Sequence, residues 1–227
     1  MSKVFSVAID GPVGAGKSCV AKKVAERLNA AYLDTGAMYR AVGLYMLENG
    51  VSLEDSAAIA ENAGKARVDV RYEGREQRTY LNGRDVTGEL RRPEVSLASS
   101  AVAKVHAVRE ALVNRQRELA RGISLVMDGR DIGTCVLTDA TLKIFLTAAP
   151  EERARRRFRQ MNGRGVQSFE DVLNDLIRRD RNDMSRAESP LRCAEDAVEL
   201  DSTSLTEDEV VERIVSLLME RTGGERA

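Results

Sequence analysis

The sequence predicts an α/β fold in which helices cover both faces of a parallel sheet. Short apolar segments typical of buried strands alternate with longer segments whose apolar residues recur at helical spacing. A glycine-rich loop separates the first apolar segment from the first helical one. Strands that alternate with helices in this way are the pattern of an open parallel sheet.

The elements of the first part of the chain follow from these local patterns. The expected elements, in order, are a strand at 4–9, a helix at 17–28, a short strand at 32–33, and helices at 37–49 and 53–66.

The pattern then changes. Residues 68–72 alternate apolar and polar side chains, as a half-buried strand does. Residues 79–81 and 84–87 flank Asn82-Gly83, a pair that favours a tight hairpin turn. We therefore expect residues 64–101 to form a small antiparallel unit inserted among the α/β elements.

The parallel pattern returns after this insertion. The expected elements are a helix at 106–121, strands at 123–127 and 142–146, and a helix after Pro150. Two further helices are expected to begin at capping boxes, one formed by Ser168 with Asp171 and one by Thr206 with Glu209.

Composition narrows the function classes. A length of 227 residues suits one domain with an insertion, or two small lobes. The net charge of −1 gives no sign of a polyanion partner, so no nucleic-acid partner is expected. No apolar run is long enough for a membrane span, and the three widely spaced cysteines favour a reducing, cytoplasmic location.

The segment Gly11–Ser18 fits the phosphate-loop pattern G-x-x-x-x-G-K-[ST]. It lies between a predicted strand and a predicted helix, which is the context the pattern requires. Backbone N–H groups in such a loop converge on phosphate oxygens, Lys17 reaches the β- and γ-phosphates, and the Ser18 hydroxyl can bind Mg²⁺. A glycine-rich turn that binds nothing is the alternative.

Two later segments follow predicted strands, where the ligands of open α/β sheets bind. The segment 34–40 offers a hydroxyl, an aromatic ring and an arginine, but it equally suits a helix start capped by Asp34 or Thr35. In the segment 128–133, Asp128 can order a water bound to Mg²⁺, and Arg130 and Asp131 would project into the same crevice. A polar turn is the alternative there.

An arginine-rich helix is expected near residue 155. Arg153 and Arg157 are four residues apart and share a helical face, and the glycine-containing turn 162–165 follows them. We interpret this segment as a lid that closes over nucleotide phosphates. A solvated charged face and a nucleic-acid-binding helix are the alternatives.

Arg179, Asp183 and Arg186 are spaced i, i+4 and i+7, which places cation, carboxylate and cation on one face of a helix. A carboxylate held between arginines stays ionised and can accept hydrogen bonds from ribose hydroxyls. A salt-bridge ladder on the surface is the alternative.

Taken together, these segments resemble the bacterial cytidylate (CMP/dCMP) kinases, a branch of the nucleoside monophosphate kinases with a phosphate loop. The segments that carry the resemblance are 9–12, 34–40, 81–87, 128–134 and 179–183 with Arg186. The resemblance implies a five-stranded parallel core at 1–34 and 102–227, with a short lid at about 155–168. It also implies an acceptor-binding lobe at 35–101 that carries the insertion at about 64–101.

The resemblance also assigns roles to individual residues. It places Ser100, Arg109 and Asp131 at the cytosine. Thr35, Tyr39, Arg40 and Arg130 fall around the CMP pocket and its phosphate, Arg179 and Asp183 at the ribose, and Arg186 near the phosphates. The residues implied in ATP binding are Gly11, Pro12, Val13, Gly14, Ala15, Gly16, Lys17, Ser18, Cys19, Arg153 and Arg157. Those implied in catalysis are Lys17, Arg130, Arg157 and Arg186. Val13 and Cys19 depart from the residues usual at their positions.

The implied reaction is transfer of the ATP γ-phosphoryl group to CMP or dCMP, with Mg²⁺ as cofactor and a cytoplasmic monomer as the enzyme. A kinase for AMP, UMP or shikimate is one alternative, and a non-catalytic nucleotide-binding regulator is another. A GTPase switch would need an Asn-Lys-x-Asp motif, which the sequence does not contain.

Overall fold

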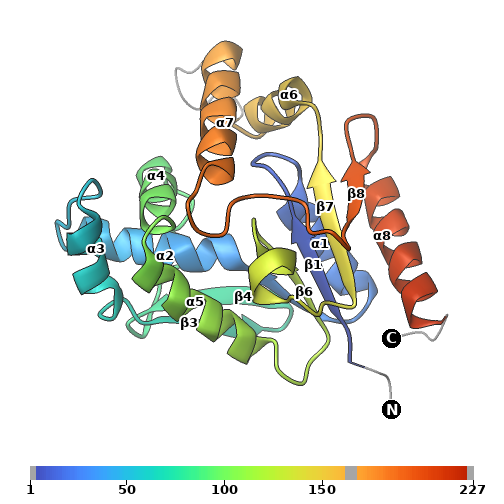
Figure 1. Ribbon diagram of the computed structural model, residues 1–227, viewed down its shortest axis with the longest axis horizontal. Helices are drawn as coiled ribbons and strands as arrows, with labels where there is room; N and C mark the ends of the chain where they lie inside the picture. The colour runs from blue at the N-terminus through green and yellow to red at the C-terminus, as the bar shows by residue number, and fades with distance from the viewer. Residues whose placement is uncertain (1–3, 162–167, 224–227) are drawn as a thin grey trace. The chain divides into compact units, whose positions relative to one another are not determined.

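The computed structural model describes residues 4–161 and 168–223 (Figure 1). The chain forms two compact units. The first comprises Met1–Ala31 and Gly122–Ala227, and the second comprises Tyr32–Arg121.

The first unit is built on a parallel sheet flanked by helices. Its elements are β1 (Ser6–Asp10), α1 (Lys17–Arg27), β6 (Leu125–Asp128), the π-helical turn η1 (Ile132–Val136), β7 (Leu142–Thr147), α6 (Pro150–Met161), α7 (Phe169–Met184), β8 (Val198–Asp201) and α8 (Glu207–Thr222). With β2 (Ala31–Asp34), where the chain passes to the second unit, the strands form a five-stranded sheet in the order β2-β6-β1-β7-β8. The predicted fold class is confirmed.

The strand register gathers the carboxyl ends of the strands at one edge of the sheet. Ile9 of β1 lies opposite Asp128 of β6, and Asp10 lies opposite Phe145 of β7. Gly11 follows directly, and a Cβ atom at this position would lie 2.0 Å from the carbonyl oxygen of Leu146. Only glycine therefore allows the chain to leave β1 along this path.

Apolar side chains of the central strands form the core of this unit, and Val7 and Leu142 are among those fully buried. α1 packs against α8 and β6. Both predicted capping boxes are present, at Ser168–Asp171 for α7 and at Thr206–Glu209 for α8.

The second unit combines helices with a small antiparallel sheet. Its elements after β2 are α2 (Thr35–Glu48), α3 (Ser56–Ala63), β3 (Val68–Glu73), β4 (Glu76–Leu81), β5 (Arg84–Asp85), α4 (Pro93–Val102) and α5 (His106–Leu119). The sheet order is β3-β4-β5, and the hairpin turns at Asn82 and Gly83, whose φ angles are 49° and 84°. The hairpin predicted around Asn82-Gly83 is confirmed.

The expectation that antiparallel structure continues to residue 101 is wrong, because α4 (Pro93–Val102) occupies the end of this stretch. Pro93 at the start of α4 loses no helical hydrogen bond. Val95 and Ala98 are fully buried, in a helix that packs closely against α2. At Gly43 of α2, a Cβ atom would lie 2.9 Å from the backbone nitrogen of Ser99, so the glycine permits this close crossing.

Among the described residues, no helix has both the length and the apolar character that a membrane crossing requires.

Candidate active site

The phosphate loop joins β1 to α1 at the carboxyl edge of the sheet. Gly14 and Gly16 have φ angles of 78° and 92°, values that a side chain would strain. Gly16 is the residue before the first turn of α1, and Lys17 and Ser18 open that helix. The loop therefore presents backbone N–H groups at a helix amino terminus, where anions bind favourably.

Lys17 is buried, with 5% of its surface exposed. Its ammonium group donates a hydrogen bond to the carbonyl oxygen of Pro12 at 2.7 Å. Burial, with the nearby Arg130 guanidinium as a second cause, lowers the pKa of Lys17 to about 7. A polyphosphate at this loop would favour the charged form of the lysine.

Ser18 and Asp128 meet at the start of α1. The Ser18 hydroxyl donates a hydrogen bond to Oδ2 of Asp128 at 2.8 Å, and Asp128 is 4% exposed at the end of β6. A hydroxyl and a carboxylate are oxygen ligands of the kind that Mg²⁺ binds together with water and phosphates. The two residues predicted at a magnesium site thus lie in direct contact.

Asp10 holds the chain segment that follows Asp131. Its two carboxylate oxygens accept hydrogen bonds from the backbone N–H groups of Ile132 and Gly133, at 2.8 and 2.7 Å. Burial raises the pKa of Asp10 to about 6, although these two hydrogen bonds act in the opposite direction. Sequence reasoning gave Asp10 no role, although its place between a buried strand and the phosphate loop was a usable signal.

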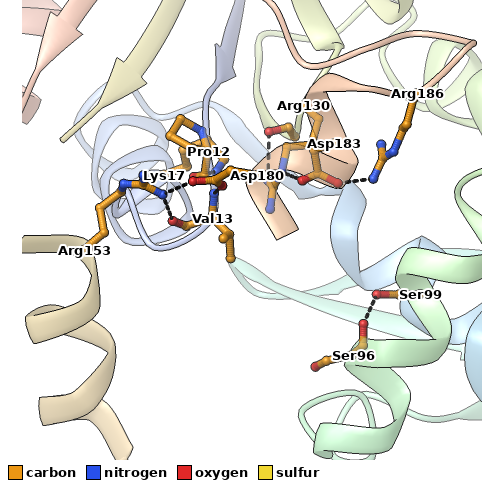
Figure 2. Close-up of polar contacts among 11 residues, drawn as sticks. Pro12, Val13, Lys17, Ser96, Ser99, Arg130, Arg153, Asp180, Asp183 and Arg186 are labelled. Atoms are coloured by element: carbon orange, nitrogen blue, oxygen red, sulfur yellow. Dashed lines mark hydrogen bonds and ion pairs between the residues drawn. The ribbon is translucent and has the colours of Figure 1, made fainter. Parts of the chain in front are cut away.

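Asp183 lies between two arginines, of which Arg186 is predicted by its spacing and Arg130 is not. Its Oδ2 accepts from Nε of Arg130 at 2.8 Å, and its other oxygen pairs with Arg186 (Figure 2). α7 ends at Met184, so the expectation that Arg186 shares a helical face with Asp183 is wrong. Because Asp183 is 6% exposed, the cluster is also not a surface ladder.

Arg179 is close enough to Arg130 and Asp183 for their charges to affect its pKa. Burial lowers the pKa of the Arg179 guanidinium, the nearby Arg130 lowers it further, and the Asp183 carboxylate opposes both effects. The concentration of positive charge favours an anionic ligand in this region.

Arg153 and Arg157 differ in their surroundings, although both are on α6. Arg153 is 5% exposed and donates to the carbonyl oxygen of Val13 at 2.8 Å, whereas Arg157 is exposed. Residues 162–167 of the predicted lid, which include the turn 162–165, lie outside the described residues.

In the second unit, α2 begins at Thr35 and carries Tyr39 and Arg40. Asp34 caps this helix by accepting from the N–H of Ala37 at 2.9 Å, and it also pairs with Arg40 at 2.8 Å. The cap that the sequence left open is therefore Asp34.

Arg109 of α5 and Tyr39 of α2 lie together in the second unit. The guanidinium carbon of Arg109 is 5.9 Å from the centre of the Tyr39 ring, within the range of a cation–π contact. Arg109 is 4% exposed, and its Nη1 donates to the carbonyl oxygen of Ala103 at 3.5 Å. Ser100 is half-buried on α4, next to Ser99, whose hydroxyl donates to the carbonyl of Ser96 (Figure 2).

The sequence that carries these features matches a known protein family. The family model described as Cytidylate kinase matches residues 7–220 of the chain. The chain belongs to the cytidylate kinase family.

Curated members of the cytidylate kinase family are similar to this chain over nearly its whole length. The cytidylate kinase of Desulforamulus reducens is 52% identical over 217 residues, which cover 95% of this chain and 97% of the relative. That of Caldanaerobacter subterraneus subsp. tengcongensis is 49% identical over 220 residues, covering 96% of each chain. The cytidylate kinase of Geobacillus kaustophilus is 49% identical over 224 residues, covering 98% of this chain and all of the relative.

Solved structures of much lower sequence identity share the fold. An uncharacterized protein from Eubacterium ventriosum matches with a TM-score of 0.53 at 16% identity, over 96% of this chain and 99% of its own. A gluconokinase from Sinorhizobium meliloti matches with a TM-score of 0.51 at 12% identity, over 95% of this chain and 92% of its own. At these identities the likeness extends to the fold alone.

Proposed function

We propose that this protein transfers the γ-phosphoryl group of ATP to CMP and dCMP, forming ADP and CDP or dCDP. The observation that carries the proposal is a phosphate loop in which Lys17 is buried and Ser18 contacts Asp128, in a chain of the cytidylate kinase family. Nothing in the sequence or structure favours the alternatives of an AMP, UMP or shikimate kinase, or a non-catalytic regulator.

The reaction needs no covalent enzyme intermediate. An oxygen of the acceptor phosphate attacks the γ-phosphorus of ATP, and the bond from that phosphorus to the β–γ bridging oxygen breaks. The electron pair leaves with ADP. Catalysis is then mainly positioning and charge neutralisation, for which Lys17, Arg130, Arg157 and Arg186 are the proposed residues.

Ser18 and Asp128 would hold Mg²⁺, Asp128 through a bound water. Their 2.8 Å contact supports this proposal, because it brings a hydroxyl and a carboxylate, both oxygen ligands that suit Mg²⁺, to one place. When bound, the ion neutralises charge on the ATP phosphates. The chain's own contribution is the loop, whose N–H groups orient the phosphates.

The acceptor-binding residues are proposed for each unit separately. In the second unit they are Thr35, Tyr39, Arg40, Ser100 and Arg109, and in the first unit they are Arg130, Asp131, Arg179, Asp183 and Arg186. The exocyclic amine of cytosine requires a hydrogen-bond acceptor, which Asp131 supplies. The ring O2 and N3 atoms require donors, which Ser100 and Arg109 supply.

Direct identification of the product tests the proposal. The purified protein is incubated with ATP, Mg²⁺ and CMP, and the nucleotides are separated by ion-exchange chromatography. We expect CDP and ADP to form in equal amounts, and no CDP to form without ATP. Hydrolysis of ATP to ADP without CDP would contradict the proposal.

A further inference from the structure

Both backbone polar groups of Val13, a residue of the phosphate loop, are hydrogen-bonded to charged side chains. Its N–H donates to Oδ1 of Asp180 at 3.1 Å, and its carbonyl oxygen accepts from Nη1 of Arg153 at 2.8 Å (Figure 2). Its side chain packs against a buried apolar cluster of Ala154, Val172 and Leu176. Residues of α6 and α7 therefore hold the backbone and the side chain of one loop residue.

The two side chains that hold this peptide also hold each other. Nη1 of Arg153 lies 2.6 Å from Oδ2 of Asp180, and their side chains are only 6% and 10% exposed. Nε of Arg153 donates to the carbonyl oxygen of Ala148 at 2.9 Å, which fixes the plane of the guanidinium. Buried charges are costly unless paired and hydrogen-bonded, so this arrangement tolerates little displacement.

Gly14, the next residue of the loop, lies close against Arg153. A Cβ atom at Gly14 would lie 3.3 Å from Cβ of Arg153 and 3.4 Å from its carbonyl oxygen. The loop thus lies directly against α6 at the point where the ion pair holds it. Gly14 begins the run of backbone N–H groups that such a loop turns toward phosphates.

We propose that Arg153 and Asp180 are positioning residues that hold the Val13 peptide, and with it the phosphate loop, in the conformation that binds the ATP phosphates. The inference rests on the proposed function for the identity of the nucleotide. It gives Arg153 a positioning role, because Nε and Nη1 of its guanidinium already hold Ala148, Val13 and Asp180.

Two single variants and their double variant distinguish a positioning role of Arg153 and Asp180 from a contribution to stability alone. Arg153→Met and Asp180→Leu each leave one buried charge without its partner, so both should lower the melting temperature. The double variant R153M/D180L contains neither charge and should recover much of that loss. It still lacks both partners of the Val13 peptide, so its affinity for ATP should stay low.

Calorimetric titration of each folded protein with Mg²⁺ and ATP measures this affinity without catalysis. We expect the Kd for ATP to rise about tenfold or more in all three variants, because small misplacements of a preorganised site are expensive. The Kd for CMP should change less than about twofold. If a single variant fails to fold, the double variant carries the test.

Leu218→Ala is the matched control, because it removes a buried side chain of α8 and should lower the melting temperature without touching Val13. Its Kd for ATP should equal that of the wild type. Recovery of ATP affinity together with melting temperature in the double variant would overturn the inference. Failure of the wild type to phosphorylate CMP would instead refute the proposed function, and the ATP titrations would still decide the positioning role.

Discussion

The two units differ in how many charged side chains they bury. Among the described residues, the charged side chains buried in the first unit are Asp10, Lys17, Asp128, Asp131, Lys143, Arg153, Asp180 and Asp183, whereas in the second unit only Arg109 is buried. The ion pairs of the second unit include surface pairs such as Arg84 with Glu48. Surface pairs of this kind contribute about 0–1 kcal/mol each.

The difference indicates that the first unit is the one in which charged groups are held in fixed positions. Buried charges are costly unless specific partners hold them, and most of those in the first unit surround the phosphate loop. That unit is thus suited to neutralise and orient a polyphosphate. The second unit places one buried cation beside an aromatic ring, which suits selective contact with an acceptor. The variants below test this division, from the largest expected effect to the smallest.

Lys17→Ala should lower kcat by about 10²–10³, because it removes the positive charge that stabilises the phosphoryl group during transfer. Steady-state assays with saturating ATP and CMP measure the loss, and circular dichroism checks that the fold persists. Lys22→Ala, on the exposed side of the same helix, is the control and should keep wild-type activity. A folded Lys17→Ala protein with wild-type kcat would exclude the assigned role.

Asp10→Asn should change how stability depends on pH. The pKa of Asp10 is about 6 in the folded protein, against an ordinary value of 3.8. A raised folded-state pKa means that the contribution of this group to stability is complete below pH ~3.8 and is lost as the pH rises through ~6. The loss amounts to as much as about 3 kcal/mol.

Urea unfolding of the wild type and Asp10→Asn at several pH values between 4 and 7 measures this contribution. The free energy of unfolding of the wild type, minus that of the variant, should fall across the window. A difference that stays constant with pH would show that Asp10 does not titrate there.

Asp183→Ala should raise the KM for CMP about 10- to 100-fold and leave the KM for ATP nearly unchanged, because a buried hydrogen-bond acceptor is lost at the proposed ribose position. Glu170→Ala is a control on the same helix, because Glu170 is an exposed residue of its first turn. A change confined to melting temperature would leave the Arg130–Asp183–Arg186 cluster with a structural role only.

Arg109→Met should raise the KM for CMP about tenfold, the loss of one good hydrogen-bonding partner, with no change in the KM for ATP. Arg121→Met, at an exposed position after the same helix, should alter neither value. Equal increases in both KM values would contradict the division of labour between the units.

Sequence reasoning succeeded where the signal was local. The phosphate loop needed only its glycines, Lys17 and Ser18, between a strand and a helix, and the hairpin needed only Asn82-Gly83. Both capping boxes were likewise visible as short patterns. The five-stranded core and the family came from the resemblance, carried by several separate segments.

Long-range partners could not be predicted in the same way. Arg130 and Asp183 are 53 residues apart and meet only because a loop after β6 reaches the end of α7. Arg153 and Asp180 belong to different helices. Helical spacing relates only residues of one helix, so it paired Arg153 with Arg157. α4 was missed because the alternating pattern before it was extended too far, although Pro93 and the spacing of Val95, Ala98 and Val102 indicated a helix.

Acceptor choice is the most direct test of the account. A coupled assay of ADP release should compare kcat/KM for CMP, dCMP, UMP and AMP at fixed ATP and Mg²⁺. We expect CMP and dCMP to be used well, UMP poorly and AMP hardly at all, with about 10- to 100-fold discrimination for each mispaired group. Equal kcat/KM values for AMP and CMP would contradict the assignment of this protein as a cytidylate kinase.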